Sequence, residues 1–369
     1  MRDGQKGARC VIVNYAKKVY PFGPVLWFML FLFVLTCFLE FAVRISMGAP
    51  RSEQLPLLRV KPDRDLGYRP LSGDQHYGYD QFITLNHLGL RGQDVGRKDQ
   101  DEYRILVFGG TQVYGLGIED RDLVSSVLEA QLRQFVSDRS YRVINFGVRA
   151  YTLTQQARFL EQVGVGLNPD HVVVVVDQYT LAPTDIQTYY HRISGRDWYM
   201  LDLDAKPDGE ALGKWYIIQM ARKSALVSWF YNVYKMWKQR NSVITQLLQG
   251  NPERFIQEQR VHVEAQIDAL LALAQQHHFQ LSIALLPVSS QVSDPAPDLL
   301  YQSTIRDLAT TRGIMFFDLL EPLRHLYQQT QTLPVAPFDE HYDADAHKAI
   351  GMFLAERLAR YIRSHATIS

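Results

Sequence analysis

Cysteine is nearly absent from this sequence: Cys10 and Cys37 are the only two among 369 residues. Both stand before residue 40, so the main part of the chain can form neither an intrachain disulfide nor a thiolate metal site. A thiol-free main part is also compatible with export from the cytoplasm.

Net charge is absent as well, because 39 Lys and Arg residues balance 39 Asp and Glu residues. Without an excess of positive charge, the chain offers no electrostatic footprint for nucleic acid, and we expect no nucleic-acid partner. The sequence also lacks internal repeats and low-complexity tracts, which excludes repeat architectures. With 369 residues, 47% of them hydrophobic, it is long enough for one large domain or two small ones.

One long apolar run stands out against this background. Val25–Leu39 contains no charged residue, and the run continues past Glu40 to Ile45. At ~1.5 Å per residue, the segment from 25 to 45 makes about 31 Å of helix, enough to cross the hydrocarbon core of a bilayer. Glu40 and Arg44 are four residues apart near its far end, where they can pair or reach the headgroups.

The flanking charges predict how this helix is oriented. Residues 1–24 contain five basic side chains and one acid, and basic flanks remain in the cytoplasm. A cleaved signal peptide is the alternative, but the lead is long and lacks a clear small-x-small cleavage site. We therefore expect a single-pass protein of the inner membrane with a cytoplasmic N-terminus and a periplasmic main domain. Its first partner is then the membrane itself, through residues 25–46.

The chain beyond residue 103 alternates between strand-like and helix-like patterns. Val172–Val176 is a run of five β-branched apolar residues, typical of a central strand buried on both faces. Such alternation predicts an α/β fold, a three-layer α/β/α sandwich with a parallel sheet. We divide the chain into a basic tail (1–24), a transmembrane helix (25–46), a membrane-proximal lead-in (47–103) and an α/β domain (104–369).

Aromatic residues gather where the alternation breaks, at about 185–250. There Leu226, Phe230, Val233 and Trp237 fall on one face of a helix. We interpret this segment as an insertion of mostly helices packed over the strand ends. An extra hydrophobic layer is the favoured interpretation, and a sugar-stacking or membrane-facing surface is the alternative.

A turn that could carry chemistry follows the first strand of the domain. Strand 104–108 leads into Gly109-Gly110-Thr111, and a helix-like pattern follows. This places Thr111 at the carboxyl edge of the sheet, where open α/β sheets bind their ligands. A capping Thr in a tight turn is the simpler interpretation. A P-loop is excluded, because its lysine and full glycine spacing are missing.

A late loop, Asp339-Glu340-His341, changes the balance because Asp and His can serve as the orienter and base of a hydroxyl nucleophile. With this loop, the sequence resembles the SGNH (GDSL-type) hydrolase superfamily, in particular its bacterial branch with an N-terminal membrane anchor. The stretches that carry the resemblance are Leu66–Arg69 with Leu85–Gly92, the turn Gly109–Thr111, Val143–Val148 and the loop Asp339–His341.

The resemblance implies a triad in which Thr111 is the nucleophile, His341 the base and Asp339 its orienter. Thr111 stands where the family has Ser, and its β-methyl restricts χ1. The family's second and third motifs are altered: Ala150 replaces a glycine, and no asparagine follows the valine strand. Candidates for stabilising the oxyanion are Gly110, Ala150, Gln178 and Tyr179.

Acidic and histidine residues are frequent around the late loop, and a metal cluster there is the competing interpretation. Their spacing fits no specific metal signature, so we expect no metal and no cofactor. For Asp343 and His347 we expect exposed or capping positions at the start of the last helix. The cluster considered consists of Asp339, His341, Asp343, Asp345 and His347.

Two hypotheses of different class follow. The first is a catalytically degenerate SGNH-like protein that serves as a binding or scaffold subunit of a membrane or envelope complex. Its partner would be a membrane protein bound through the anchor helix or the 185–250 insertion. The second is an esterase, acetylhydrolase or acetyltransferase acting on O-acyl groups of an envelope glycan through a Thr-His-Asp triad. The missing Ser and Asn lead us to favour the first.

Overall fold

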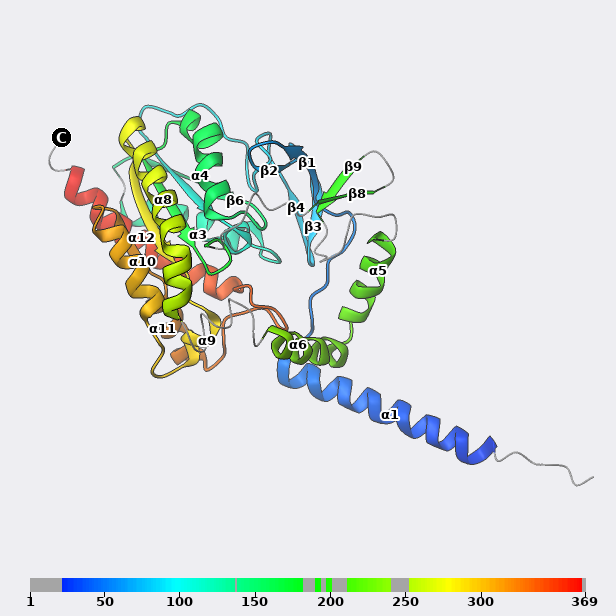
Figure 1. Ribbon diagram of the computed structural model, residues 1–369. Helices are drawn as coiled ribbons and strands as arrows, with labels where there is room; N and C mark the ends of the chain where they lie inside the picture. Colours follow the sequence, from blue (N-terminus) through cyan, green and yellow to red (C-terminus); the bar gives the residue numbers. More distant parts are fainter. Residues whose placement is uncertain are drawn as a thin grey trace, which may run out of the picture.

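The computed structural model describes residues 22–136, 138–181, 190–193, 197–200, 211–239 and 252–366. Its centre is a five-stranded parallel sheet in the order β11-β10-β7-β5-β6 (Figure 1). The strands are β5 (Glu102–Gly109), β6 (Ser140–Gly147), β7 (His171–Val176), β10 (Gln280–Leu285) and β11 (Met315–Asp318). From β5 the chain adds β6 on one side and then β7 on the other, so the direction of sheet growth reverses at β5. Such a switch point between β5 and β7 opens a crevice at the carboxyl ends of the strands.

Helices cover both faces of this sheet, as predicted. Successive strand residues point to opposite faces, so Val172 and Val174 join one core cluster while Val173 and Val175 join the other. The first cluster includes side chains of α4 (Leu153–Phe159), α8 (Pro252–His277) and α10 (Leu300–Thr310). The second includes side chains of α3 (Val124–Phe135), α9 (Ser289–Ser293), α11 (Leu320–Thr330) and α12 (Ala344–Ala366). The three-layer α/β/α prediction is confirmed.

The membrane-proximal lead-in carries more regular structure than its composition indicates. It forms β1 (Arg59–Asp63), β2 (Gly67–Pro70), β3 (Gln75–Gly78) and β4 (Gln81–Thr84). β1 also pairs with β9 (Asp197–Met200), which pairs with β8 (Tyr190–Ile193). Side chains of the lead-in, including Tyr68 and Ile83, are buried in the same core cluster as the α/β domain. The lead-in is therefore packed against the domain as part of one core.

The described parts of the 185–250 segment are β8, β9 and two helices, α5 (Ala211–Arg222) and α6 (Ala225–Gln239). The expectation of mostly helices thus missed a strand pair. The favoured hydrophobic layer is also wrong for α6, because Phe230 and Val233 are 59% and 41% exposed. Its buried positions are small residues, Ala225 and Ser228. The side chains of Trp198, Trp215 and Trp237 lie outside the described residues.

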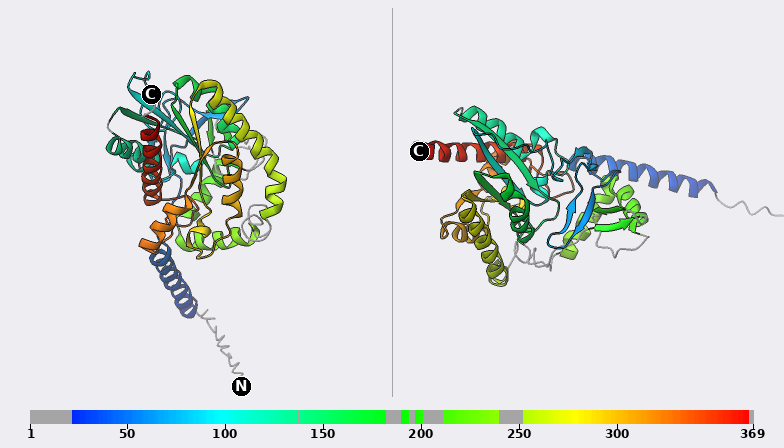
Figure 2. Two further views of the ribbon diagram at one scale, coloured as in Figure 1. Left: turned by 90° about the vertical axis from the view of Figure 1, so that its left-hand side faces the viewer. Right: turned by 90° about the horizontal axis from the view of Figure 1, so that it is seen from above.

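Helix α1 (Phe22–Met47) projects away from the domain, on the side opposite the C-terminus (Figures 1 and 2). Among the described residues, its segment Gly23–Met47 is the one helix long and apolar enough to cross a membrane. Its large apolar side chains are exposed. The predicted pair of Glu40 and Arg44 is formed, with Nε and Oε1 2.6 Å apart.

The remaining described elements are short helical turns that connect strands to helices. They are α2 (Thr111–Tyr114), η1 (Asp120–Asp122), η2 (Leu160–Gly164) and η3 (Val165–Leu167). Of these, α2 matters most for the site, because it begins two residues after the end of β5.

Candidate active site

The sharp turn from β5 into α2 places Thr111 at the carboxyl edge of the sheet, as the sequence predicts. Thr111 is the first residue of α2. A Cβ on Gly109 would lie 2.2 Å from Cγ2 of Val113, so only glycine lets the strand meet the helix this closely. Gly110 is the N-cap residue, with Thr180 and the carbonyl of Tyr151 packed close against it. The turn therefore lies at the switch point between β5 and β7, where ligands bind in this class of sheet.

The backbone N–H of Ala150 donates to Oγ1 of Thr111, with N and Oγ1 3.1 Å apart. Ala150 has φ +58°, a left-handed conformation that glycine adopts without cost and alanine does not. Glycine, which the resemblance places at this position, would adopt this φ without strain. Alanine at 150 therefore stores local backbone strain. This backbone conformation directs the N–H of Ala150 toward the hydroxyl of Thr111.

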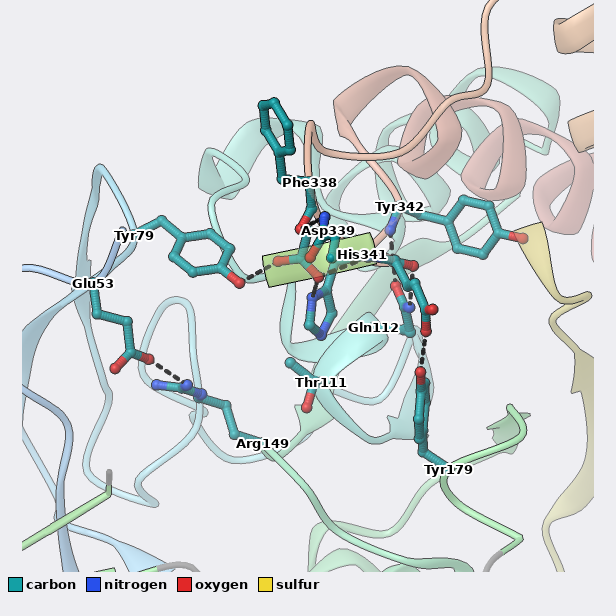
Figure 3. Close-up of polar contacts among 12 residues, drawn as sticks. Glu53, Tyr79, Thr111, Gln112, Arg149, Tyr179, Phe338, Asp339, His341 and Tyr342 are labelled. Carbon is teal, nitrogen blue, oxygen red and sulfur yellow. Dashed lines mark hydrogen bonds and ion pairs between the residues drawn. The ribbon is translucent and has the colours of Figure 1, made fainter. Parts of the chain in front are cut away.

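Asp339 and His341 form the expected pair. Nδ1 of His341 lies 2.7 Å from Oδ1 of Asp339, and the hydroxyl of Tyr79 donates to Oδ2 (Figure 3). Burial pushes the pKa of Asp339 upward, but the His341 charge and the hydrogen bonds from His341 and Tyr79 outweigh it and hold the pKa below its usual range. Burial likewise lowers the pKa of His341, yet the charge and hydrogen bond of Asp339 raise it above its usual value. The carboxylate thus holds one ring nitrogen and stabilises the protonated ring.

Gln112, the residue after Thr111, fastens the Asp339 loop to the turn. Its Nε2 donates to the carbonyl of Glu340 at 3.1 Å, and its Oε1 accepts from the N–H of Tyr342 at 3.0 Å. Sequence analysis missed both Gln112 and Tyr79. A polar residue directly after the nucleophile position was the one available signal for Gln112, while Tyr79 carries none, because the lead-in brings it to the site only through the fold.

A buried ion pair supports the backbone that carries Ala150. Arg149 lies beside it, and its guanidinium pairs with the carboxylate of Glu53 in the lead-in (Figure 3). The two side chains are 8% and 2% exposed, so each relies on the other for compensation. Because Arg149 directly precedes Ala150, this pair helps to hold the strained turn in place.

The hydroxyl of Thr111 is not hydrogen-bonded to His341. Figure 3 shows Thr111 below the imidazole ring of His341, with its hydroxyl turned away from the ring. The hydroxyl instead accepts the N–H of Ala150. A turn about χ1 is needed before the base can receive its proton, and a β-branched side chain makes that turn harder.

The segment after β7 forms a closed turn where the family has asparagine. Oδ1 of Asp177 accepts the N–H groups of Tyr179 and Thr180, at 2.9 and 2.8 Å. The Tyr179 hydroxyl donates to the carboxylate of Glu340. Oε1 of Gln178 is buried without a hydrogen-bond partner. Ala150 is therefore the candidate oxyanion residue that donates to Thr111 in this structure.

Asp343 and His347, at the start of α12, differ in burial and in hydrogen bonding. Oδ1 of Asp343 accepts the N–H groups of Asp345 and Ala346, both at 3.0 Å, so the expected capping role is confirmed. The expectation of an exposed or capping position is wrong for His347, which is 1% exposed and accepts the N–H of Val124 at Nδ1. Burial lowers the pKa of His347 to about 3, so the ring is neutral. Across the described residues, no three or more His, Cys, Asp or Glu side chains converge to hold a metal.

No family model matches the chain, and no curated protein matches it. Solved structures do. LAE5, an alpha/beta hydrolase enzyme from the metagenome of Lake Arreo, is 14% identical with a TM-score of 0.41, covering 69% of this chain and 94% of that one. Axe2, an acetylxylan esterase from Geobacillus stearothermophilus, is 11% identical with a TM-score of 0.40, covering 69% and 93%. A member of the lipolytic protein G-D-S-L family from Veillonella parvula is 12% identical with a TM-score of 0.39, covering 69% and 97%.

The described core is a three-layer α/β/α sandwich around a five-stranded parallel sheet. Similarity at this level of identity and TM-score says nothing about reaction or substrate. Thr111 follows β5, Ala150 follows β6 and the Asp339–His341 pair precedes α12, which is the order that the resemblance drawn from the sequence predicts. One apolar helix precedes the domain.

Proposed function

We propose that this protein is a membrane-anchored, extracytoplasmic enzyme that hydrolyses or transfers acyl groups bound through an ester. In the first step, Oγ1 of Thr111 attacks the ester carbonyl carbon while Nε2 of His341 takes the hydroxyl proton. The oxyanion accepts the N–H of Ala150. The bond to the leaving alcohol then breaks, the alcohol takes the proton from His341, and an acyl-threonine ester remains. Water or a second hydroxyl attacks this ester in the same way.

The observation that carries the proposal is the completed Asp339–His341 pair. Both carboxylate oxygens have partners, one from His341 and one from Tyr79. A base held in one orientation by a half-buried carboxylate is what nucleophilic catalysis by a hydroxyl group requires. Gln112 fastens the same loop to the residue next to Thr111. O-acyl groups of an envelope glycan are the substrate class that the family resemblance suggests.

The location of the enzyme is part of the proposal. The apolar helix α1 and the basic residues before it support an inner-membrane anchor with a cytoplasmic N-terminus. The α/β domain then lies on the periplasmic side, where envelope glycans are found.

A chromogenic acetyl ester tests the chemistry on the full-length protein in detergent micelles. We compare the native protein with Thr111→Ala and His341→Ala. Matched controls are Thr310→Ala and His325→Ala, which remove the same side chains from exposed positions on α10 and α11. The proposal expects both site variants to lose at least about 10²-fold in rate and both controls to keep it. A rate that is indifferent to Thr111 and His341 would contradict it.

A second candidate is the non-catalytic subunit, a membrane-tethered binding or scaffold protein. It is favoured by the Thr111 hydroxyl, which is bonded to Ala150 and not to His341, and by the absence of asparagine after β7. Its partner would be a membrane protein held through α1 or the 185–250 segment. No rate above buffer, together with a stoichiometric partner in mild detergent extracts, would support this candidate over the enzyme.

A further inference from the structure

The outward face of α6 is apolar and aromatic from Val227 to Tyr234. Large side chains on this helix are 37–59% exposed, while Ala225 and Ser228 on the opposite face are buried. Such a surface is unusual on a domain in water, where contiguous apolar patches mark a contact. The exposed residues are Val227, Trp229, Phe230, Tyr231, Val233 and Tyr234.

The anchor helix itself holds the start of α6. The carboxylate of Glu40 accepts the N–H groups of Ala225 and Leu226, at 2.8 and 2.9 Å, and the hydroxyl of Ser224 at 2.7 Å. Arg44 donates to the carbonyl of Lys223 at 2.6 Å. A carboxylate from α1 therefore caps the N-terminus of α6, where the free N–H groups and the helix dipole favour negative charge.

These contacts determine where α6 lies along the anchor. The apolar segment spans Gly23–Met47, and Glu40 and Arg44 lie in its last two to three turns. A bilayer crossed by this segment ends close to that level. Figures 1 and 2 show α5 and α6 gathered at the end of α1 that meets the domain. On α5, Tyr216, Ile217 and Met220 are exposed too.

We infer that α5 and α6 lie in the membrane interface, with the exposed apolar face of α6 seated between the headgroups and the acyl chains. This inference rests on the proposed membrane anchoring by α1. Helix α6 contacts α1, whose large apolar side chains are also exposed and would be covered by the bilayer. Trp and Tyr are the side chains enriched at this depth, because an apolar ring carries a polar tip. The carboxylate of Glu40 has protein donors for its oxygens, as a site with little water requires.

Helix α6 also contacts the loop of the candidate active site. Nδ2 of Asn232, on α6, donates to the carbonyl of Phe338 at 3.2 Å. Phe338 directly precedes Asp339 and has φ +59°, so this bond braces a strained residue next to the catalytic pair. Through Asn232, helix α6 is thus joined to the loop that carries Asp339 and His341.

We call the proposed placement of α6 between headgroups and acyl chains the membrane seat. Spin labels on the full-length protein in nanodiscs of phosphatidylethanolamine and phosphatidylglycerol test this seat. With Cys10 replaced by Ser, the native Cys37 on α1 reports whether the anchor is in lipid. In a background with Cys37→Ala as well, single labels at Phe230→Cys and Tyr234→Cys report on α6. Val261→Cys is the matched control, because Val261 is 75% exposed on α8, which packs against the sheet.

We expect oxygen to collide with the labels at 230 and 234 several-fold more than a water-soluble nickel chelate does, at a depth of about 5–10 Å. The label at 261 should show the reverse. A lipid-exposed Cys37 label with water-exposed labels at 230 and 234 would overturn the seat but leave the anchor standing. Labels at 230 and 234 shielded from both reagents would overturn it in favour of a protein cover. A water-exposed Cys37 label would overturn the anchor and the seat together.

Discussion

At the scale of single residues, the γ-methyl group of Thr111 limits the rotation of its hydroxyl about χ1. Ser and Thr carry the same hydroxyl, but the β-branch restricts its rotation about χ1. In this structure the hydroxyl rests on the N–H of Ala150, 3.1 Å away. Reaching His341 therefore requires a rotamer that the methyl group opposes.

Thr111→Ser removes this obstacle, and we expect it to raise the acetyl-esterase rate. An off-rotamer side chain costs about 0.5–1.5 kcal/mol, which corresponds to an increase of roughly 2- to 10-fold. The measurement is kcat/KM with the chromogenic ester, beside Thr310→Ser as the control. An unchanged rate in an active enzyme would show that rotation of Thr111 does not limit the chemistry.

The Asp339–His341 pair makes a prediction about pH. His341 acts as a base only when neutral, and Asp339 raises its pKa above the usual 6.5, so the native rate rises with pH as the ring loses its proton above that value. In Asp339→Asn the raised pKa is lost, so the acid limb of the rate profile should move to lower pH. The plateau should fall by roughly 10²–10⁴-fold, because the ring is no longer held and stabilised.

A pH–rate profile from about 5 to 9 checks this for both proteins. The sign for stability follows from the same shift. A raised His341 pKa stabilises the fold below the unfolded pKa, and that contribution disappears as pH rises through the folded value. An acid limb that stays in place in Asp339→Asn would show that another group controls the base.

At the scale of elements, the joint between α1 and α6 is the feature with the clearest energetic role. Three donors at the start of α6 end on one carboxylate, that of Glu40. Glu40 lies in the helix that is long and apolar enough to cross a membrane, so the cap also joins α6 to that helix.

Glu40→Ala should loosen the first turn of α6. Loss of a helix cap costs about 1 kcal/mol, which corresponds to about fivefold faster opening of the protected amides. Hydrogen exchange at residues 225–228 in nanodiscs measures the change. Thr36→Ala, which removes a hydroxyl bonded only within α1, is the control and should leave exchange on α6 as it was. Equal exchange in Glu40→Ala and the native protein would show that the cap does not hold α6.

At the scale of the whole molecule, the anchor and the α/β domain predict a single topology. Under the proposed anchoring, the basic tail before the apolar helix predicts a C-terminus on the periplasmic side. An alkaline phosphatase fused after Ser369 should therefore be active in a Gram-negative host. A green fluorescent protein fused at the same position should be dark, and a bright fusion with an inactive phosphatase would reverse the proposed orientation.

The sequence predicted those parts of the fold that local pattern controls. The valines of β7 are buried on both faces and form a central strand, as their uniform apolar character requires. Strands and helices alternated clearly enough to predict the layers. The favoured hydrophobic layer was wrong for the outward face of α6, because the helical stripe with Phe230 and Val233 predicts one apolar face but not whether the rest of the chain covers it.

The site divides in the same way. Thr111, Asp339 and His341 were found because a strand-to-helix turn and an Asp-x-His loop are short, local patterns, and the structure brings them to one edge of the sheet. Tyr79 and Asn232 reach Asp339 and Phe338 from segments 260 and 106 residues away. No local pattern encodes a contact at such separation.

The sequence by itself thus determined the long apolar helix, the layered α/β fold and the residue types at the turn and the late loop. These depend on periodicity, hydropathy and neighbouring residues, which any short stretch carries. Only the tertiary structure decided that the Thr111 hydroxyl rests on Ala150, that Glu40 caps α6, and that α6 braces the loop of Asp339. These contacts join distant segments, and their geometry exists only once the common core has brought those segments together.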